Sequence, residues 1–424
     1  VAQAGCSQSR AAFLTGLYPH QSGQIGLATW GFEMFREDTP NVVRSLKDAG
    51  YRCGIVGKLH VNPESAFPFD FRAINNGNFA RDGLERYAAS AAEFMAAGDE
   101  PFFLSVNYPD AHREMFSQIH GLPKNPLVSE DIPPLRYIGL DSPTLRKDTV
   151  DYYNSMARLD ALVGDLLAAL DASGKADNTI VVYFGDHGAD LIRGKRTSFE
   201  GGVRIPLLVR WPGHVAPGQR RAELTSTVDL LPTFLDAAQA DPIPDLQGRS
   251  LVPLLEGRDT AWREYLFTEF HLHSPDNYYP QRTVRNDRFK LVQNLFPDEV
   301  NPGHDYTIDK YYSQDEVNAA LANAPAEVQQ AYAQSRRPPA FELYDLESDP
   351  SEFKNLANDP EYAEVLAELQ QVLETWRVET KDPFLNLDHA RRLQAEIAAT
   401  KKGTKFVKKR ESWEYVDYMN PTAN

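Results

Sequence analysis

Cys6 and Arg10 could do chemistry together, because they place a thiol and a guanidinium at helical spacing. They lie in AGCSQSRAAFLTG (4–16), where small polar residues precede a run predicted to open a helix. A helix N-terminus offers free backbone N–H groups to an anion, and an arginine one turn later adds a planar donor. The pair therefore predicts a site for a tetrahedral anion, sulfate or phosphate. A thiolate nucleophile at Cys6 is the simple alternative.

Three further pairs of ionisable residues follow apolar runs that predict strands. Lys58 and His60 follow YRCGIVG (51–57), Asp110 and His112 follow PFFLSVNY (101–108), and Asp186 and His187 follow TIVVYFG (179–185). In open α/β sheets the functional crevice lies at the carboxyl ends of the strands. A hydrogen-bonded loop residue is the alternative for each histidine alone, but three pairs at three strand ends favour one shared site.

The segment GDHGAD (185–190) could bind a cation. The glycines allow a sharp turn, and a carboxylate oxygen and an imidazole nitrogen favour a hard ion such as calcium or magnesium. Two ligands are too few, so others must come from elsewhere in the chain. Arg193, Lys195 and Arg196 follow closely and could neutralise an oxyanion, with a solvated charged loop as the alternative.

The elements that must position these residues indicate an α/β domain over 1–262. The three runs above and PLLVRW (206–211) show little polar alternation, which is typical of strands buried on both faces of a parallel sheet. A helix is predicted from Ser142 and Pro143 to Gly174, with leucines on one face. We expect a large mixed, mostly parallel sheet sandwiched by helices.

A smaller α+β domain with an antiparallel sheet is predicted over 263–385. REYLFTEF, QRTVRNDRFKLVQNL and FELYDL indicate its strands, and a helix with an apolar stripe follows the N-cap Asp359 and Pro360. Residues 386–424 are basic, with eight Lys and Arg against five Asp and Glu. We expect a solvated extension that wraps the surface, with a tail that grips a polyanion as the alternative.

Composition excludes several classes of protein. The 424 residues carry a net charge of -16, which argues against general nucleic-acid binding. No apolar run is long enough to span a membrane. The two cysteines, Cys6 and Cys53, cannot form a disulfide framework, and Cys53 is predicted to be an inert thiol in a buried strand.

Taken together, the motifs resemble the type I, formylglycine-dependent sulfatases of the alkaline phosphatase superfamily. Cys6 to Arg10 look like the Cys-x-Pro/Ala-x-Arg motif, with Gln8 where the family has Pro or Ala. GYRCGIVGKLH, GDHG and GKRTSFEGGVRIPLLVRWPG look like further family segments, and the likeness extends through ELYDLESDPSEFKNLANDP. GKLHVNPESAFPFDF, VNYPDAHR and YYPQRTVRNDRFKLVQNL look most like the sulfamidase branch.

The resemblance implies that Cys6 is oxidised to formylglycine, whose hydrated form attacks sulfur. It implies that Arg10, Lys58 and Lys195 stabilise the sulfuryl oxygens, that His112 assists the leaving group, and that His60 takes the proton that releases sulfate. Asp186, His187 and residue 6 would hold calcium, with magnesium as the alternative. The family's paired aspartates have no counterpart before Cys6, so we expect a first strand to precede Val1.

Substrate selection is expected from residues around the pocket mouth. The segment EFHLHSPDNYYPQR of the second domain offers aromatics and hydrogen-bond donors that suit a sugar, with packing between domains as the alternative. The candidates for substrate binding are Asp110, Arg113, Arg196, His271, His273 and Arg282.

The expected partners are a sulfated saccharide substrate and, during maturation, a formylglycine-generating enzyme or an anaerobic maturase. The sequence fits cleavage of either a sulfate ester or a sulfamate. It does not decide whether the protein forms a homodimer. By analogy we expect a periplasmic or secreted protein, lysosomal in a eukaryote. The alternatives are a phosphoester or phosphonate hydrolase of the same superfamily and an inactive glycan-binding pseudo-sulfatase.

Overall fold

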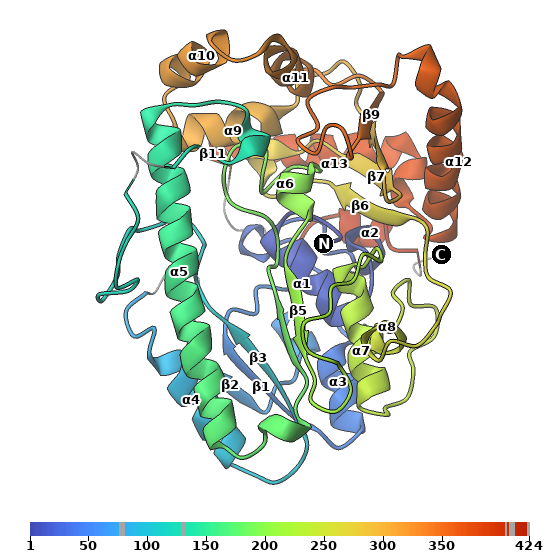
Figure 1. Ribbon diagram of the computed structural model, residues 1–424. Coiled ribbons are helices and arrows are strands. Elements are labelled where there is room, and N and C mark those ends of the chain that lie inside the picture. Colours follow the sequence, from blue (N-terminus) through green and yellow to red (C-terminus); the bar gives the residue numbers. More distant parts are fainter. Residues whose placement is uncertain (76–80, 129–131, 403–404, 407–411, 422–424) are drawn as a thin grey trace.

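A parallel three-stranded sheet of order β2–β1–β3 lies in the lower half of the molecule (Figure 1). The computed structural model describes residues 1–75, 81–128, 132–402, 405–406 and 412–421. The strands are β1 (Arg52–Gly57), β2 (Phe71–Ala73) and β3 (Phe102–Asn107). Gly57 ends β1 at a φ of 88°, where a Cβ would collide with the carbonyl of Asn107. The chain therefore leaves the sheet at this turn, just before Lys58.

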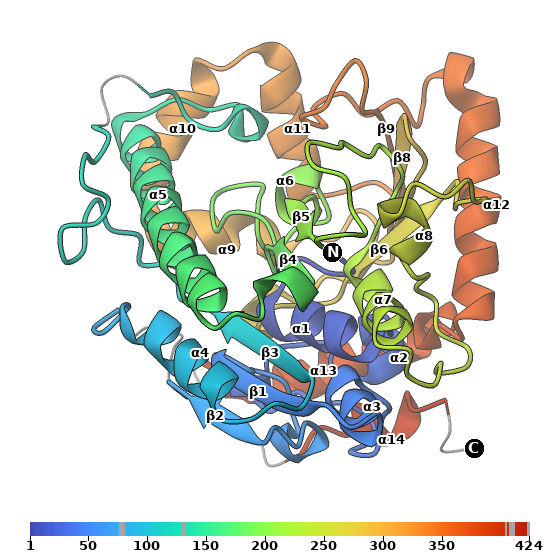
Figure 2. The same cartoon turned by 60° about the horizontal axis from the view of Figure 1, so that its bottom comes forward.

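Helices cover both faces of this sheet (Figure 2). One face packs against α4 (Arg86–Ala96) and α5 (Pro143–Ala172), and the other against α1 (Cys6–Thr15), α3 (Val42–Asp48) and α7 (Leu230–Ala237). The Ser142 hydroxyl accepts from the Leu145 N–H at 3.2 Å, and Gly174 follows the helix at a φ of 71°. The predicted boundaries of this helix are therefore confirmed by its cap and its stop.

The strands β4 (Val181–Phe184) and β5 (Leu207–Arg210) pair with each other in antiparallel fashion. Within the described residues they form a sheet separate from β1–β3. The expectation that both runs continue a mostly parallel sheet is therefore corrected. Apolar runs of this kind predict burial, but strand direction depends on the neighbour that each strand meets.

The C-terminal part contains the predicted antiparallel sheet, in the order β6–β7–β8–β9. Its strands are β6 (Leu266–Phe270), β7 (Gln281–Arg285), β8 (Phe289–Asn294) and β9 (Phe341–Asp345). The helix α12 (Ala363–Glu379) packs on it through Leu369, Leu373 and Trp376. Asp359 caps a short turn, η8 (Pro360–Tyr362), so α12 itself begins later than predicted.

Three helices connect β8 to β9 and cover the upper end of α5 (Figure 1). They are α9 (Pro302–Tyr311), α10 (Gln314–Ala322) and α11 (Ala326–Arg336). The short helices elsewhere are α2 (Pro19–Ser22), α6 (Glu200–Val203) and α8 (Val252–Leu255). In the part of the chain that is described, none of the helices has the length and apolar character that crossing a bilayer requires.

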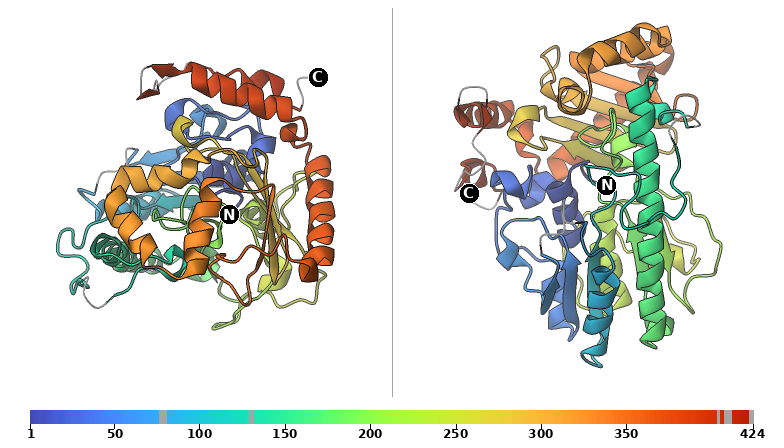
Figure 3. Two further views of the ribbon diagram at one scale, coloured as in Figure 1. Left: turned by 90° about the horizontal axis from the view of Figure 1, so that it is seen from above. Right: turned by 90° about the vertical axis from the view of Figure 1, so that its left-hand side faces the viewer.

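Residues after 385 pack against the N-terminal segment, as Figure 3 shows by the contact of dark red with blue. They form α13 (Leu387–Ala399), β10 (Lys401–Lys402), β11 (Lys405–Phe406) and α14 (Tyr415–Tyr418). The ring of Trp413 stacks on Phe32 at 4.3 Å, and the Tyr415 hydroxyl donates to the Glu33 carbonyl at 2.7 Å. The segment does wrap the surface, but it is anchored by buried aromatic rings, so its expected solvated character is wrong. The division into domains stays a prediction.

Candidate active site

Cys6 is the first residue of α1 and lies in the protein interior. Gly5 precedes it in extended backbone, and all ten residues of α1 are buried. The free N–H groups of the first turn therefore face the interior, where the field of the helix end is poorly screened. The predicted helix start is confirmed, and it places residue 6 where an anion would be stabilised.

Cationic groups and imidazoles surround the Cys6 thiol. Its Sγ lies 3.3 Å from the His187 Nε2 atom. Burial raises the pKa of Cys6, but the charges of Lys195, Lys58 and His187, with a hydrogen bond from His112, together lower it well below its usual value. The site therefore favours negative charge at residue 6.

His60 and His273 also interact with the Cys6 side chain. Burial lowers the pKa of His60 to about 4, and burial also lowers the pKa of His273 well below its usual value. Both imidazoles are therefore neutral near pH 7, and a neutral imidazole can accept a proton. Of the predicted substrate-binding residues, His273 is the one that the structure brings to Cys6.

Arg10 holds the carboxyl ends of β1, β3 and β4 together. Its Nε donates to the Asp186 carboxylate at 3.0 Å, and its Nη1 donates to the Lys58 carbonyl at 2.9 Å and the Asn107 Oδ1 at 2.8 Å. The convergence of strand ends that the sequence predicted is confirmed. Asn107 was missed, although it is a polar residue at the end of an apolar strand, like the residues that were found.

One group of side chains in the described part of the chain has the composition of a metal site. Ligand atoms of Cys6, Asp186 and His187 all lie within 4.8 Å of one another. Burial raises the pKa of Asp186, but His187 and Arg10 outweigh this effect and lower it to about 2. A carboxylate that stays ionised beside an imidazole fits a divalent cation.

Asp190 joins the basic residues of the following loop into one cluster. Its carboxylate pairs with Lys195 at 3.4 Å and also with Arg196 and Arg113. Burial lowers the pKa of Lys195, but Cys6 and Asp190 outweigh it and leave the pKa raised. Lys195 therefore stays charged beside residue 6. Sequence reasoning missed Asp190, because nothing marked this carboxylate as the shared partner of three cations.

Three predicted substrate-binding residues are instead engaged in buried ion pairs or hydrogen bonds. Asp110 accepts two bonds from Arg158, at 2.7 and 2.8 Å. Arg282 donates to both oxygens of Asp382, at 2.9 and 2.7 Å, and to His271 at 3.1 Å. The side chains of Asp110, His271 and Arg282 are all 0% exposed. A direct substrate contact is corrected for these three, since the polar atoms of each side chain are already bonded within the protein.

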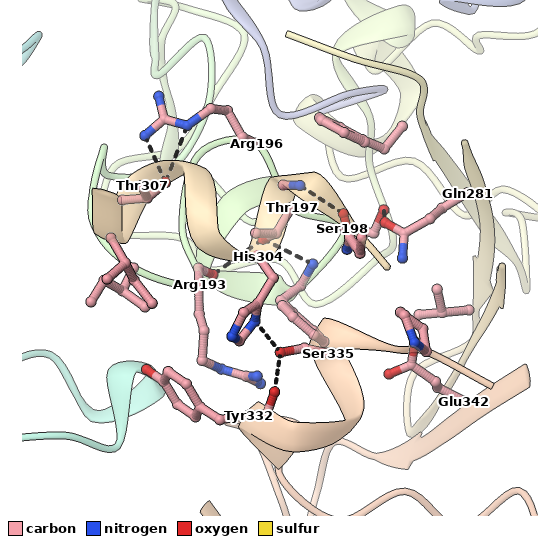
Figure 4. A pocket seen from close by; sticks show the side chains of 18 residues that line it. Arg193, Arg196, Thr197, Ser198, Gln281, His304, Thr307, Tyr332, Ser335 and Glu342 are labelled. Atoms are coloured by element: carbon pink, nitrogen blue, oxygen red, sulfur yellow. Dashed lines mark hydrogen bonds between the residues drawn. The ribbon is translucent and has the colours of Figure 1, made fainter. Parts of the chain in front are cut away.

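Arg113 and Arg196 also make ion pairs within the protein. Both pair with Asp190, which in turn pairs with Lys195 of the Cys6 cluster. The Arg113 Nη2 donates to Asp148 at 2.6 Å. Arg196 donates to the Thr307 hydroxyl of α9, beside a small cavity of about 50 Å³ (Figure 4). Their expected contact with substrate stays a prediction.

A cleft of about 930 Å³ runs between β3 and β4 and reaches the Cys6 cluster. Lys58, His112 and His187 line one end of it, and apolar side chains of α5 such as Leu159 and Val163 line another part. The cleft therefore follows the edges of β3 and β4, which have no strand between them among the described residues, and ends at the Cys6 cluster.

Comparisons with known proteins identify the family of the chain. The sulfatase family model matches residues 1–240, and the C-terminal model of N-sulphoglucosamine sulphohydrolase matches 185–337. The chain is 33% identical to human N-sulphoglucosamine sulphohydrolase over 90% of its length and 82% of that protein. It is 29% identical to an ulvan-active sulfatase of Formosa agariphila, over 88% and 71%.

A solved structure in complex with D-glucosamine-2-N,6-O-disulfate has a similar fold. Its TM-score is 0.63 at 20% identity, with 90% of each chain covered. The sulfatase family model and the identity with human N-sulphoglucosamine sulphohydrolase show that the chain belongs to the sulfatase family. The expected fold class and enzyme class are confirmed.

Proposed function

We propose that this sulfatase removes sulfate from a saccharide by means of an oxidised residue 6. The observation that supports it most directly is the Cys6 environment: a buried helix start enclosed by Lys58, Lys195, His112 and His187. The identity with human N-sulphoglucosamine sulphohydrolase favours a sulfamate on glucosamine as the substrate. A sulfate ester on a related sugar is the second substrate that the site would accept.

In this proposal Cys6 is converted to formylglycine, which as a geminal diol supplies the nucleophilic hydroxyl and carries the sulfuryl group as a sulfo-enzyme intermediate. Lys58, Lys195 and Arg10 neutralise the charge on the sulfuryl oxygens. His112 gives a proton to the departing sugar nitrogen or oxygen. His60 takes the proton of the second hydroxyl, so that sulfate leaves and the aldehyde returns.

A divalent cation, calcium with magnesium as the alternative, fits Asp186, His187 and an oxygen of residue 6. When bound, it would polarise a sulfuryl oxygen and the attacking hydroxyl. Arg10 orients the Asp186 carboxylate through their 3.0 Å contact. Further ligands are expected from the paired aspartates that the family resemblance implies. The same proposal includes maturation by a formylglycine-generating or anaerobic enzyme. It also includes a location outside the cytoplasm and assembly into a homodimer.

Mass spectrometry of the peptide that contains residue 6 tests the proposal, together with sulfate release from N-sulfoglucosamine. Protein from a host with a maturation enzyme should carry the aldehyde and release sulfate. Cys6→Ala should abolish release, whereas the control Cys53→Ala should retain it, since Cys53 is packed in β1 and burial raises its pKa to about 12. An unmodified thiol in active protein would contradict the mechanism.

His60→Ala tests the release step separately. It should leave residue 6 carrying a sulfuryl group after one turnover, visible as a mass adduct, because the proton acceptor for collapse is missing. His214→Ala is the control, since His214 is half-exposed and pairs with Glu256.

Two outcomes would favour the alternative functions. Faster turnover of a phosphate monoester than of any sulfate would indicate the phosphoester hydrolase, and binding of a glycan without turnover would indicate the pseudo-sulfatase.

A further inference from the structure

His112 lies on the loop that leaves the sheet at the end of β3. The loop turns at once, because the His112 N–H donates to the Pro109 carbonyl at 2.8 Å. His112 lines the same end of the cleft as Lys58 and His187, so the loop carries its ring to the Cys6 cluster. A histidine that gives a proton to a departing atom must be held in one orientation. The residues that fix this loop therefore affect the reaction.

The carboxylate of Asp110, two residues before His112, lies between two buried arginines. The Arg158 guanidinium of α5 donates from Nε and Nη2 to its two oxygens, at 2.7 and 2.8 Å. The Arg81 Nε donates to the same carboxylate at 3.3 Å. The side chains of Asp110 and Arg158 are 0% exposed, and that of Arg81 is 9% exposed. Paired charge-assisted bonds of this kind fix both the distance and the orientation of a carboxylate.

The same two arginines bind backbone carbonyls further along the loop. The Arg81 Nη2 donates to the carbonyl of His112 itself. The Arg81 guanidinium lies 5.3 Å from the ring centre of Phe116, and the Arg158 Nη1 donates to the Phe116 carbonyl at 3.1 Å. The two cations thus fix the loop before His112, at His112 and after it.

The ring of His112 is oriented by the residue that follows it. Its Nδ1 lies 2.5 Å from the Arg113 carbonyl, and a carbonyl can only accept, so Nδ1 carries a hydrogen. Nε2 is therefore the nitrogen that is available for the hydrogen bond with Cys6. The Arg113 side chain is fixed in turn, since its Nε donates to the Asp190 carbonyl at 2.8 Å and its Nη2 to Asp148 at 2.6 Å.

We propose that Arg81 and Arg158 are positioning residues for His112, and that they act through the buried carboxylate of Asp110. The inference rests on the proposed function, in which His112 gives a proton to the leaving group. As the S–N bond breaks and the S–O bond to residue 6 forms, the nitrogen leaves with the bonding pair and takes the proton of Nε2, while Nδ1 keeps its own. A shift of Nε2 by about 1 Å can lower such a rate about 100-fold.

The first test compares kcat/KM for two substrates that need this acid to different extents. N-sulfoglucosamine must release an amine and needs a proton, whereas para-nitrophenyl sulfate releases nitrophenolate, which is stable as an anion. The ratio of the first value to the second should fall about tenfold in Arg81→Met and in Arg158→Lys. It should fall further, about 100-fold or more, in His112→Ala, which removes the general acid itself.

Arg263→Met is the matched control, because it breaks a buried pair of the same kind elsewhere. Arg263 is 11% exposed and donates to both oxygens of the fully buried Asp229, at 2.7 and 2.5 Å. Asp229 directly precedes α7, on the opposite face of the sheet from α5 (Figure 2). This variant should lower the melting temperature and leave the ratio unchanged. A fall as large as that in Arg81→Met would show that the ratio follows stability alone, and would overturn the inference.

A double variant asks the same question with N-sulfoglucosamine alone. Adding Arg81→Met to His112→Ala should cause no further loss of kcat/KM, because the arginine acts through a ring that has been removed. Losses that multiply would overturn the inference. So would wild-type ratios in the folded Arg81→Met and Arg158→Lys proteins. Arg81→Met decides alone if Arg158→Lys does not fold.

Failure of the proposed function has a different signature. Wild-type protein that releases no sulfate from N-sulfoglucosamine would overturn the proposed function itself. A ratio that His112→Ala leaves unchanged would overturn the role of His112 as the acid, and the inference with it. A ratio that falls in His112→Ala but in neither arginine variant would overturn the inference alone.

Discussion

At the scale of single residues, Gln8 stands where the family motif has Pro or Ala, and its side chain has a structural role. Its side chain is fully buried, and its Nε2 donates to the carbonyls of Leu272 and Ile25, at 2.6 and 3.1 Å. Gln3 donates to the same Leu272 carbonyl at 3.0 Å. Gln8 therefore joins α1 to the loop that carries His273, which Pro or Ala at this position could not do.

We predict that Gln8→Ala lowers the free energy of unfolding by about 1–3 kcal/mol, because it leaves the buried Ile25 carbonyl without this donor. Urea denaturation followed by fluorescence measures the change. Gln371→Ala on the exposed face of α12 is the matched control and should change little. Equal stability of Gln8→Ala and wild-type protein would show that the two bonds contribute nothing.

At the scale of elements, a buried lysine of β8 fixes the end of the loop that carries Lys195. The Lys290 Nζ donates to the Ser198 carbonyl at 2.6 Å and pairs with Glu200 at 3.2 Å and Glu352 at 2.8 Å. The Lys290 side chain is 1% exposed. The C-terminal sheet thus holds the end of the loop that carries Lys195.

We expect Lys290→Met to destabilise the protein by about 3–5 kcal/mol, because two buried carboxylates lose their shared cation. It should also lower kcat for N-sulfoglucosamine, since the Lys195 loop loses its anchor. Thermal denaturation and sulfate release measure the two effects. Lys354→Ala removes an exposed lysine of the same part of the chain and should leave both unchanged. A fully stable Lys290→Met protein would contradict this role for the lysine.

Local sequence signals predicted the main helices and strands. They could not identify which residues, distant in the sequence, pair in the folded chain. The helix over 143–172 followed from its cap and stop, and the strand ends at Lys58 and Asp186 followed from apolar runs. The antiparallel pairing of β4 with β5 and the bond between Arg282 and Asp382 depend on residues that meet only in the folded chain. Asp110, His271 and Arg282 were predicted to bind substrate because the sequence does not show which polar side chains already have a partner inside the protein.

At the scale of the whole molecule, a buried network joins the N-terminal and C-terminal halves. His20 Nδ1 lies 2.5 Å from the Glu269 carboxylate of β6, and His271 contacts Gln3 at 3.1 Å. Arg282 links His271 to Asp382, beyond the end of α12. Every charged side chain of this network is buried, so its protonation states couple directly to folding.

We predict that the protein loses stability as the pH falls below about 6.5, the ordinary pKa of histidine. Burial, helped by Arg282, lowers the pKa of His271 to about 3, so the unfolded chain binds a proton that the folded chain does not. The unfolded state is therefore favoured as pH falls from 6.5 towards 3, by about 2 kcal/mol at pH 5 from this group alone.

A second loss should begin near pH 4.5, because His20 and Arg282 outweigh burial and lower the pKa of Glu269 to about 2. Urea denaturation at pH 7.0, 6.0, 5.0 and 4.0 measures both stages. The variant His271→Gln should be less stable at pH 7 but should lose less between pH 7 and 5 than the wild type. Parallel pH profiles for the two proteins would contradict the assignment to His271 and would move the acid sensitivity to His60 and His273, whose pKa values burial also lowers.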